Sequence, residues 1–233
     1  KSSVSLLQSS STCMVIGFNL NKASRLSKYN IKKIISKTKK DYPEFSKKIS
    51  LLHKQANKLS KKEFLELFTK VNSKYRVKHL NKNYSKKFLK ALDKDKRFNI
   101  FIKQIVTNNL MSKTQKSLFL LKSKKYSPAI NFYLAINLIS HNRAKKALPY
   151  LNYAYSKNSS EAVKNKILFW KYIVSDDRKY IKILLKSKKN DIYTLFAKDF
   201  YQIKLTNAVF TLKQKKYSKK DEFNELSQFE WIK

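Results

Sequence analysis

Few side chains in this sequence have the types and spacing that catalysis or metal binding requires. Histidine occurs only at His53, His79 and His141, and no two of them show the H-x-x-x-H or H-E-x-x-H spacing that places two imidazoles on one helix face. Cys13 is the only cysteine, so no intramolecular disulfide and no cysteine-rich metal site can form. Gly17 is the only glycine, which excludes glycine-rich phosphate loops and the G-x-S-x-G elbow. The sequence therefore assigns no catalytic, metal-ligating, cofactor-binding or ligand-binding residue, and we interpret each histidine as a surface or partly buried helix residue.

Acidic side chains lie close together in sequence at four places, and paired carboxylates are what glycoside hydrolysis would need. The chain has 53 lysines and arginines against 15 acidic residues, so we interpret each group as a helix-start charge or as a partner for nearby lysines. The four groups are Glu63 with Glu66, Asp93 with Asp95, Asp176 with Asp177, and Asp221 with Glu222 and Glu225. The third group precedes a predicted helix, where capping explains it.

The net charge of +38 indicates an anionic partner, which would be nucleic acid, anionic lipid or an acidic polymer. Coding bias competes with this interpretation, because nearly all basic residues are lysines spread along the whole chain. Arginine, which phosphate recognition prefers, is rare: Arg25, Arg76, Arg97, Arg143 and Arg178. We favour coding bias and solubility, and retain a nucleic-acid-binding or ribosome-associated protein as an alternative function.

Aromatic residues alternate with lysines at 166–172 and at 179–180, a pattern that could form a stacking surface for bases or sugars. Their helical spacing instead favours a place in the core for most of them. We expect Phe169 and Trp170 to be buried, since they lie in the densest apolar run.

The elements that would position any site are helices. Apolar residues recur at i, i+3, i+4 and i+7 between short polar breaks, and no segment alternates as a strand would. Helix starts are marked by Ser60 with Glu63, a capping box, and by Ser127 followed by Pro128. The longest early apolar run, 13–18, is too short for a transmembrane helix. The sequence predicts an all-α fold of about ten or eleven helices.

Residues 143–203 read as two consecutive helical hairpins, which bury their apolar faces only against neighbours. We expect one helix over 144–155, another over 161–174, two more over 178–186 and 192–203, and a short last helix around Val209. Because the hairpins lack a fixed period, we expect a curved, TPR-like α-superhelix. Residues 1–28 are expected to be a poorly ordered or irregular segment, and residues 29–233 a single superhelical domain.

Residues 143–203 also resemble the helical repeat segment of soluble lytic murein transglycosylases, particularly the epsilonproteobacterial type. The resemblance rests on A-L-x-Y-L-x-x-A at 147–154, F-W-x-Y at 169–172, D-x-x-Y at 177–180, L-x-x-S at 184–187 and I-Y-x-L-x-A-K at 192–198. It implies a periplasmic, curved helical domain that packs against a lysozyme-like domain and positions peptidoglycan.

The catalytic motif of that family, of the E-S-x-F type, is absent from this chain. We therefore assign no catalytic role of that family to any residue of this chain. We expect either the helical part of a longer transglycosylase or a stand-alone relative, with a lysozyme-like partner domain in cis or in trans. The alternatives are the nucleic-acid-binding protein, which would be cytoplasmic, and a TPR-like protein-interaction scaffold.

Overall fold

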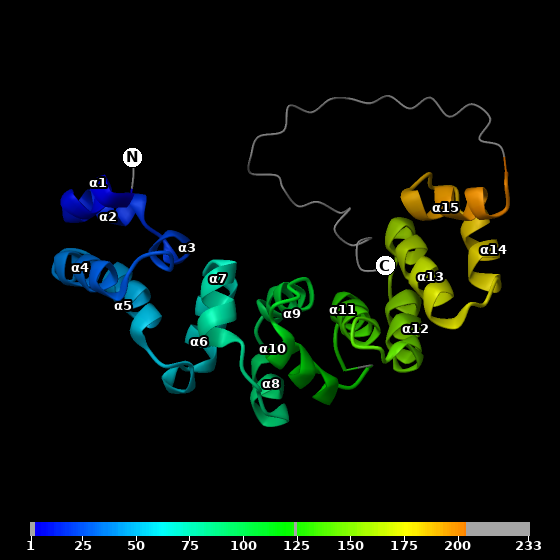
Figure 1. Ribbon diagram of the computed structural model, residues 1–233, viewed down its shortest axis with the longest axis horizontal. Coiled ribbons are helices and arrows are strands. Elements are labelled where there is room, and N and C mark those ends of the chain that lie inside the picture. The colour runs from blue at the N-terminus through cyan, green and yellow to red at the C-terminus, as the bar shows by residue number, and fades with distance from the viewer. Residues whose placement is uncertain (1–2, 124, 204–233) are drawn as a thin grey trace. The chain divides into compact units, whose positions relative to one another are not determined.

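The computed structural model describes residues 3–123 and 125–203, and within these ranges it is all-helical with no β-strand, as predicted (Figure 1). The α-helices are α1 (Ser3–Gln8), α2 (Ser11–Gly17), α3 (Leu20–Ala23), α4 (Lys28–Thr38), α5 (Pro43–Ser50), α6 (Lys61–Lys70), α7 (Ser73–Tyr75), α8 (Lys86–Leu92), α9 (Phe98–Val106), α10 (Ser112–Ser117), α11 (Pro128–Ile139), α12 (Leu148–Ser156), α13 (Glu161–Ser175), α14 (Lys179–Leu185) and α15 (Ile192–Phe200). Short 3-10 turns are η1 (Leu51–His53), η2 (Ala56–Lys58), η4 (Leu118–Leu120) and η5 (Ala144–Lys146), and η3 (Arg76–Leu80) is a π-helix.

The predicted number of helices was wrong, because the described residues contain fifteen α-helices where we expected ten or eleven. Part of the difference lies in residues 3–23, whose serine-rich sequence forms three short helices. Polar side chains cap two of them: Ser10 Oγ accepts a hydrogen bond from the backbone N–H of Cys13, and Asn19 Oδ1 accepts one from Lys22. Local capping therefore makes helices where apolar periodicity is too weak to predict them. The helix expected around Val209 lies outside the described residues.

The helix expected over 144–155 is divided into the 3-10 turn η5 and helix α12. Pro149 explains the division, because proline has no backbone N–H and is accepted only in the first turn of an α-helix. The apolar face of this segment is nevertheless buried at Ala147, Leu151 and Ala154, while Ala144, Leu148 and Tyr155, which share its helical spacing, are partly buried.

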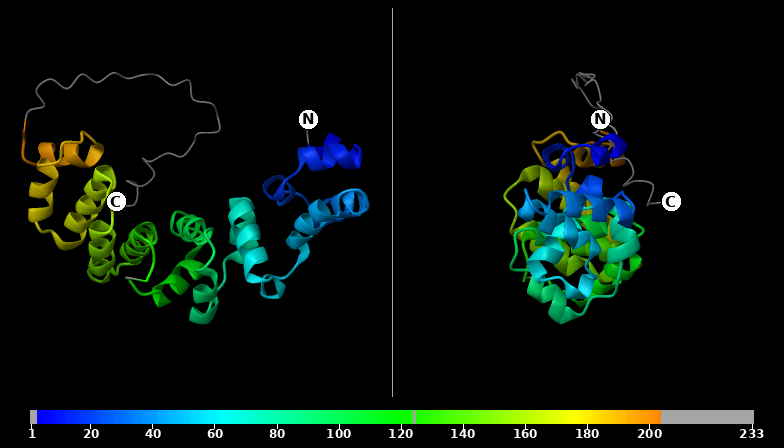
Figure 2. Two further views of the ribbon diagram at one scale, coloured as in Figure 1. Left: turned by 180° about the vertical axis from the view of Figure 1, so that it is seen from behind. Right: turned by 90° about the vertical axis from the view of Figure 1, so that its left-hand side faces the viewer.

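The chain divides into two compact units, an N-terminal unit of residues 1–137 and a C-terminal unit of residues 138–233. In the N-terminal unit, α2 and α5 pack against α4, and α8 and α9 pack against α6 (Figures 1 and 2). The apolar faces of α6 and α9 follow the helical period, and all of these residues are buried: Phe64, Leu67, Phe68, Val71, Phe98, Phe101, Ile102 and Ile105. Aromatic rings thus form the centre of this core.

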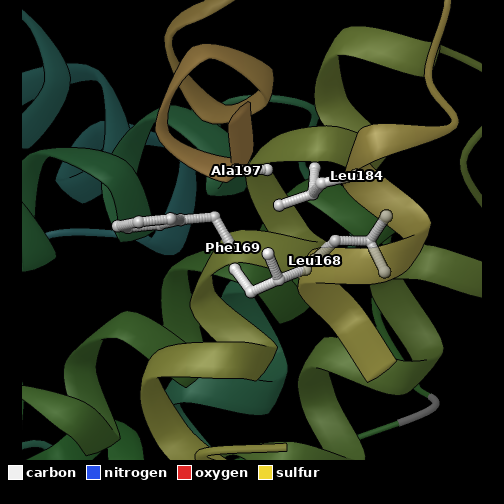
Figure 3. Packing of buried hydrophobic residues seen from close by; sticks show 5 residues of the cluster. Leu168, Phe169, Leu184 and Ala197 are labelled. Atoms are coloured by element: carbon white, nitrogen blue, oxygen red, sulfur yellow. The ribbon is translucent and has the colours of Figure 1, made fainter. Parts of the chain in front are cut away.

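In the C-terminal unit, each of the helices α12 to α15 packs against the next one in sequence, and α13 also contacts α15. One core cluster of the unit consists of five buried residues from three helices, Leu168, Phe169, Ile181, Leu184 and Ala197 (Figure 3). Helix α13 lies at the centre, because α12, α14 and α15 all contact it.

No described helix is long and apolar enough to cross a membrane. The superhelical arrangement and the expected division of the sequence at residue 28 stay predictions.

The capping box predicted for α6 is confirmed, and it provides a stability test. Ser60 Oγ accepts a hydrogen bond from the Glu63 N–H at 3.2 Å, and Glu63 Oε2 accepts one from the Ser60 N–H at 2.9 Å. Hydrogen bonds from Lys54 and Ser60 lower the pKa of Glu63 to about 2, so this carboxylate stays ionised far into the acid range. Ser60→Ala should lower the free energy of unfolding by about 1 kcal/mol in urea denaturation followed by circular dichroism.

Ser36→Ala is the matched control, because the Ser36 hydroxyl donates only to the Lys33 carbonyl within its own exposed helical turn. It should change the free energy of unfolding by less than about 0.5 kcal/mol. Equal losses for the two variants would contradict a capping role for Ser60.

Candidate functional site

Lys171 is a buried lysine held between two tyrosine rings of the C-terminal unit. The residue belongs to α13 and is only 8% exposed. Its Nζ lies 5.1 Å from the ring centroid of Tyr155 on α12 and 4.3 Å from that of Tyr180 on α14. Both distances are within cation–π range, so the rings give a buried ammonium the stabilisation that water would otherwise provide.

Two further lysines extend this arrangement. Lys164 Nζ lies 5.6 Å from the ring centroid of Tyr155, and Lys179 Nζ lies 4.9 Å from that of Tyr180. We call Tyr155, Lys164, Lys171, Lys179 and Tyr180 the lysine–tyrosine cluster. Each of its rings already has two ammonium groups over it, so an incoming ligand meets positive charge in place of a bare aromatic face.

One carboxylate partly balances the cluster. Asp177 Oδ2 forms an ion pair with Lys179 Nζ at 2.6 Å. The hydrogen bond from Lys179 lowers the pKa of Asp177 and raises the pKa of Lys179. Burial lowers the pKa of Lys171, the charge of Lys179 lowers it further, and Asp177 opposes both effects. Three ammonium groups against one carboxylate leave the cluster with a net positive charge.

The turn between α13 and α14 sets the position of Tyr180 relative to Lys171. Helix α13 ends at Ser175, and the next residue, Asp176, adopts the left-handed conformation with φ of 52°. The Asp177 side chain then accepts a hydrogen bond from the backbone N–H of Lys179 at 3.0 Å, and Ser175 Oγ donates to the Lys171 carbonyl at 2.7 Å. The N-cap position of α14 is Arg178, which forms no side-chain cap, so the acidic pair contributes to this helix start only through the Asp177 hydrogen bond. This turn brings the first residues of α14 back towards α13.

A polar network that extends from the buried Asn165 to the surface fixes the opposite end of α13. Asn165, which is buried, donates through Nδ2 to Ser187 Oγ at 2.8 Å and to Asp191 Oδ2 at 2.9 Å. Glu161 Oε1 accepts hydrogen bonds from Ser187 Oγ at 2.7 Å and from the Lys188 N–H at 2.9 Å. Because α13 is anchored at both ends, the lysine–tyrosine cluster lies on a fixed framework.

The acidic pairs considered in the sequence serve ion pairs and caps. Glu66 contacts Lys48 at 3.2 Å and Arg97 at 4.0 Å, and Asp95 binds Arg97 through two side-chain hydrogen bonds. These interactions agree with the prediction that such carboxylates pair with basic residues. The group at 221–225 lies outside the described residues.

The histidines and aromatic residues are placed as follows. His53 is partly exposed and His79 exposed in the N-terminal unit, while His141 is partly exposed in the C-terminal unit. Among the described residues, no group of three or more histidine, cysteine or acidic side chains could hold a metal ion. Phe169 is buried as expected, whereas Trp170 is only partly buried.

Sequence reasoning did not identify Lys171 or Tyr155 as members of a site. The sequence does contain a signal for Lys171, namely its spacing from apolar residues. Lys171 is four residues after the buried Ile167 and three after the buried Leu168, so it lies on the apolar face of α13. A lysine in an apolar stripe requires partners, and Tyr155 and Tyr180 provide them. No such signal pointed to Tyr155, because its approach depends on how α12 packs against α13.

The chain matches no known protein family and no curated protein with which it was compared. The class of protein is therefore defined by its own structure. It is an all-helical protein whose C-terminal unit carries a fixed, positively charged lysine–tyrosine cluster.

Proposed function

We propose that this chain is a non-catalytic helical scaffold that binds peptidoglycan, and that the lysine–tyrosine cluster contacts the carboxylates of its stem peptides. The observation that carries the proposal is the set of three ammonium groups gathered over two tyrosine rings at one place on α12–α14. Ammonium groups bind carboxylates, and a partly desolvated setting strengthens the interaction.

The exposure of the three lysines assigns them different roles. The Lys179 side chain is 61% exposed and Lys164 is partly exposed, so both can meet a ligand directly. Lys171 lies between the rings, where it adds positive potential and holds Tyr155 and Tyr180 in place. Removal of Lys171 should therefore weaken binding even though little of its side chain is exposed.

The resemblance to the helical segment of soluble lytic transglycosylases supports the same function. A TPR-like superhelix in the periplasm would present the cluster to the cell wall, and a lysozyme-like domain in cis or in trans would cleave the glycan strand. The cluster disfavours the nucleic-acid alternative, because base stacking needs open aromatic faces and each ring here already carries two ammonium groups.

Retention on purified sacculi tests the proposal. At physiological salt of about 0.15 M, the protein should be retained above a control protein of equal net charge. Conversion of the sacculus carboxylates to amides should release it, since the ammonium groups lose their partners. No retention above the charge-matched control, or equal retention on amidated sacculi, would contradict the proposal. Stronger binding to single-stranded oligonucleotides would favour the alternative.

A further inference from the structure

A second basic group lies in the N-terminal unit, on the first turn of α4 and on the π-helix η3. Lys28 and Lys32 belong to α4, Lys78 belongs to η3, and Lys82 follows it; all four are exposed. In the part of the chain that the structure describes, none of the four forms an ion pair. Four uncompensated ammonium groups make this the kind of surface that attracts an anionic partner.

Contacts through Tyr75 join η3 to the turn η1. The Tyr75 ring packs against His79 of η3 with 4.5 Å between centroids, and its hydroxyl donates to the carbonyl of Leu52 at 2.9 Å. Leu52 precedes His53 in η1, so η3 is joined to the turn that carries the second histidine. Lys28 lies close enough to both imidazoles to act on their protonation.

The π-helix η3 is anchored firmly. Arg76 Nη1 donates to the Val71 carbonyl at 2.6 Å and to the Phe68 carbonyl at 3.3 Å, which binds the start of η3 to the end of α6. The Asn72 side chain accepts a hydrogen bond from the Tyr75 N–H at 2.9 Å. Isolated π-helical turns are rare and are often found at functional sites. Here the turn holds Lys78 and His79 on a fixed backbone.

Exposed apolar side chains lie on the neighbouring helices. Tyr29, which is 75% exposed, is three residues from Lys32, and Lys28 is four residues from Lys32, so each of them is a helical neighbour of Lys32 on α4. Ile16, which is 82% exposed, lies on α2, and α2 packs against α4 (Figure 2). Tyrosine and aliphatic side chains beside lysines are typical of surfaces that rest on a lipid bilayer.

We propose that the basic surface formed by Lys28, Lys32, Lys78 and Lys82 docks on anionic phospholipid headgroups, and that docking strengthens as the pH falls. The lysines meet the headgroup phosphates, while Tyr29 and Ile16 reach the interfacial region. This surface lies in the N-terminal unit and would bind headgroup phosphates. The proposal therefore does not depend on the lysine–tyrosine cluster, which would bind carboxylates.

The two histidines provide the pH dependence. Burial lowers the pKa of His53 first, followed by the charges of Lys32 and Lys28. Partial desolvation of the largely exposed His79 ring also lowers its pKa, followed by the charges of Lys78, Lys28 and Lys82. Both imidazoles are therefore neutral at neutral pH and become charged on acidification. Lys54, the residue after His53, forms an ion pair with Glu63, so its charge is already balanced by a carboxylate. Each added proton raises the positive charge that faces the lipid, and the lipid in turn raises the pKa of each imidazole.

Vesicle co-sedimentation of the whole chain tests the proposal. The protein should bind vesicles of phosphatidylcholine with about 30% phosphatidylglycerol and remain free of pure phosphatidylcholine vesicles, because the attraction is electrostatic. Replacement of the four lysines by serine should lower the partition coefficient by about six hundred-fold, since each lysine near such a surface contributes a factor of about five. Because both histidine pKa values are lowered from the ordinary value of 6.5, the rise should come below that pH. The wild-type partition coefficient should then rise by about five-fold for each imidazole that becomes charged, and His79→Gln should reduce the rise.

The matched control replaces Lys86, Lys87, Lys90 and Lys94, which are exposed lysines on and just after α8, and removes the same charge. It should keep most of the binding. Equal losses for the two quadruple variants, equal binding to neutral vesicles, or displacement by millimolar inorganic phosphate or by an oligonucleotide would overturn the proposal. Circular dichroism checks that each variant is folded, and His141 provides an internal NMR reference in the other unit.

Discussion

Phe64→Ala should lower the free energy of unfolding of the N-terminal unit by about 4 kcal/mol. Phe64 is fully buried at the centre of an aromatic cluster. Its ring centroid lies 5.1 Å from Phe88, 5.5 Å from Tyr84, 5.8 Å from Phe68 and 6.0 Å from Phe101. Truncation removes these contacts and leaves a cavity that surrounding rings fill only in part. Urea denaturation followed by circular dichroism measures the loss.

Two comparisons separate burial from a general effect of the substitution. Phe64→Leu retains much of the buried volume and should lose clearly less than the alanine variant. Tyr29→Ala removes an exposed ring and should change the free energy of unfolding by less than about 0.5 kcal/mol. A loss below about 1.5 kcal/mol for Phe64→Ala would show that this ring is not at the centre of the core.

The second large effect is expected in binding. A variant with Lys164→Gln, Lys171→Met and Lys179→Gln should bind sacculi about thirty-fold more weakly. It loses two direct charge contacts and the positive potential of Lys171, at about 0.7 kcal/mol each. The control variant, Lys86→Gln, Lys87→Gln and Lys90→Gln, has the same net charge and should bind nearly as well as the wild type. Titration of each variant against sacculi at fixed salt gives the comparison, and equal weakening would mean that binding follows net charge alone.

Lys171→Met alone separates binding from folding. Methionine fills a similar volume between Tyr155 and Tyr180 and removes the desolvation of a buried charge, so stability should be unchanged or raised. Binding should nevertheless fall, because the ammonium between the rings is lost. A fall in the free energy of unfolding by more than about 1.5 kcal/mol would instead assign Lys171 a structural role.

Local signals made the helical fold predictable from the sequence. The capping box at Ser60 and Glu63 marks the start of α6, and the apolar period of 161–174 marks α13, because both patterns act within a few residues. The helices in residues 3–23 were missed, since caps at Ser10 and Asn19 form them without a strong apolar stripe.

The lysine–tyrosine cluster could be predicted only in part. Lys171 lies on the apolar face of α13, which the 3.6-residue period shows. The sequence does not show that Tyr155 and Tyr180 are the partners of Lys171. Their approach depends on how α12 and α14 pack against α13 and on the left-handed turn at Asp176. These are tertiary features, and helical periodicity carries no information about them.

Protection of individual lysines from acetylation tests the central claim most directly. The whole protein is treated briefly with acetic anhydride, with and without soluble peptidoglycan fragments, and mass spectrometry measures modification at each lysine. The fragments should protect Lys164 and Lys179 and leave Lys86 and Lys87 of α8 as reactive as before. Uniform protection of all four lysines, or none at Lys164 and Lys179, would contradict peptidoglycan binding at the lysine–tyrosine cluster.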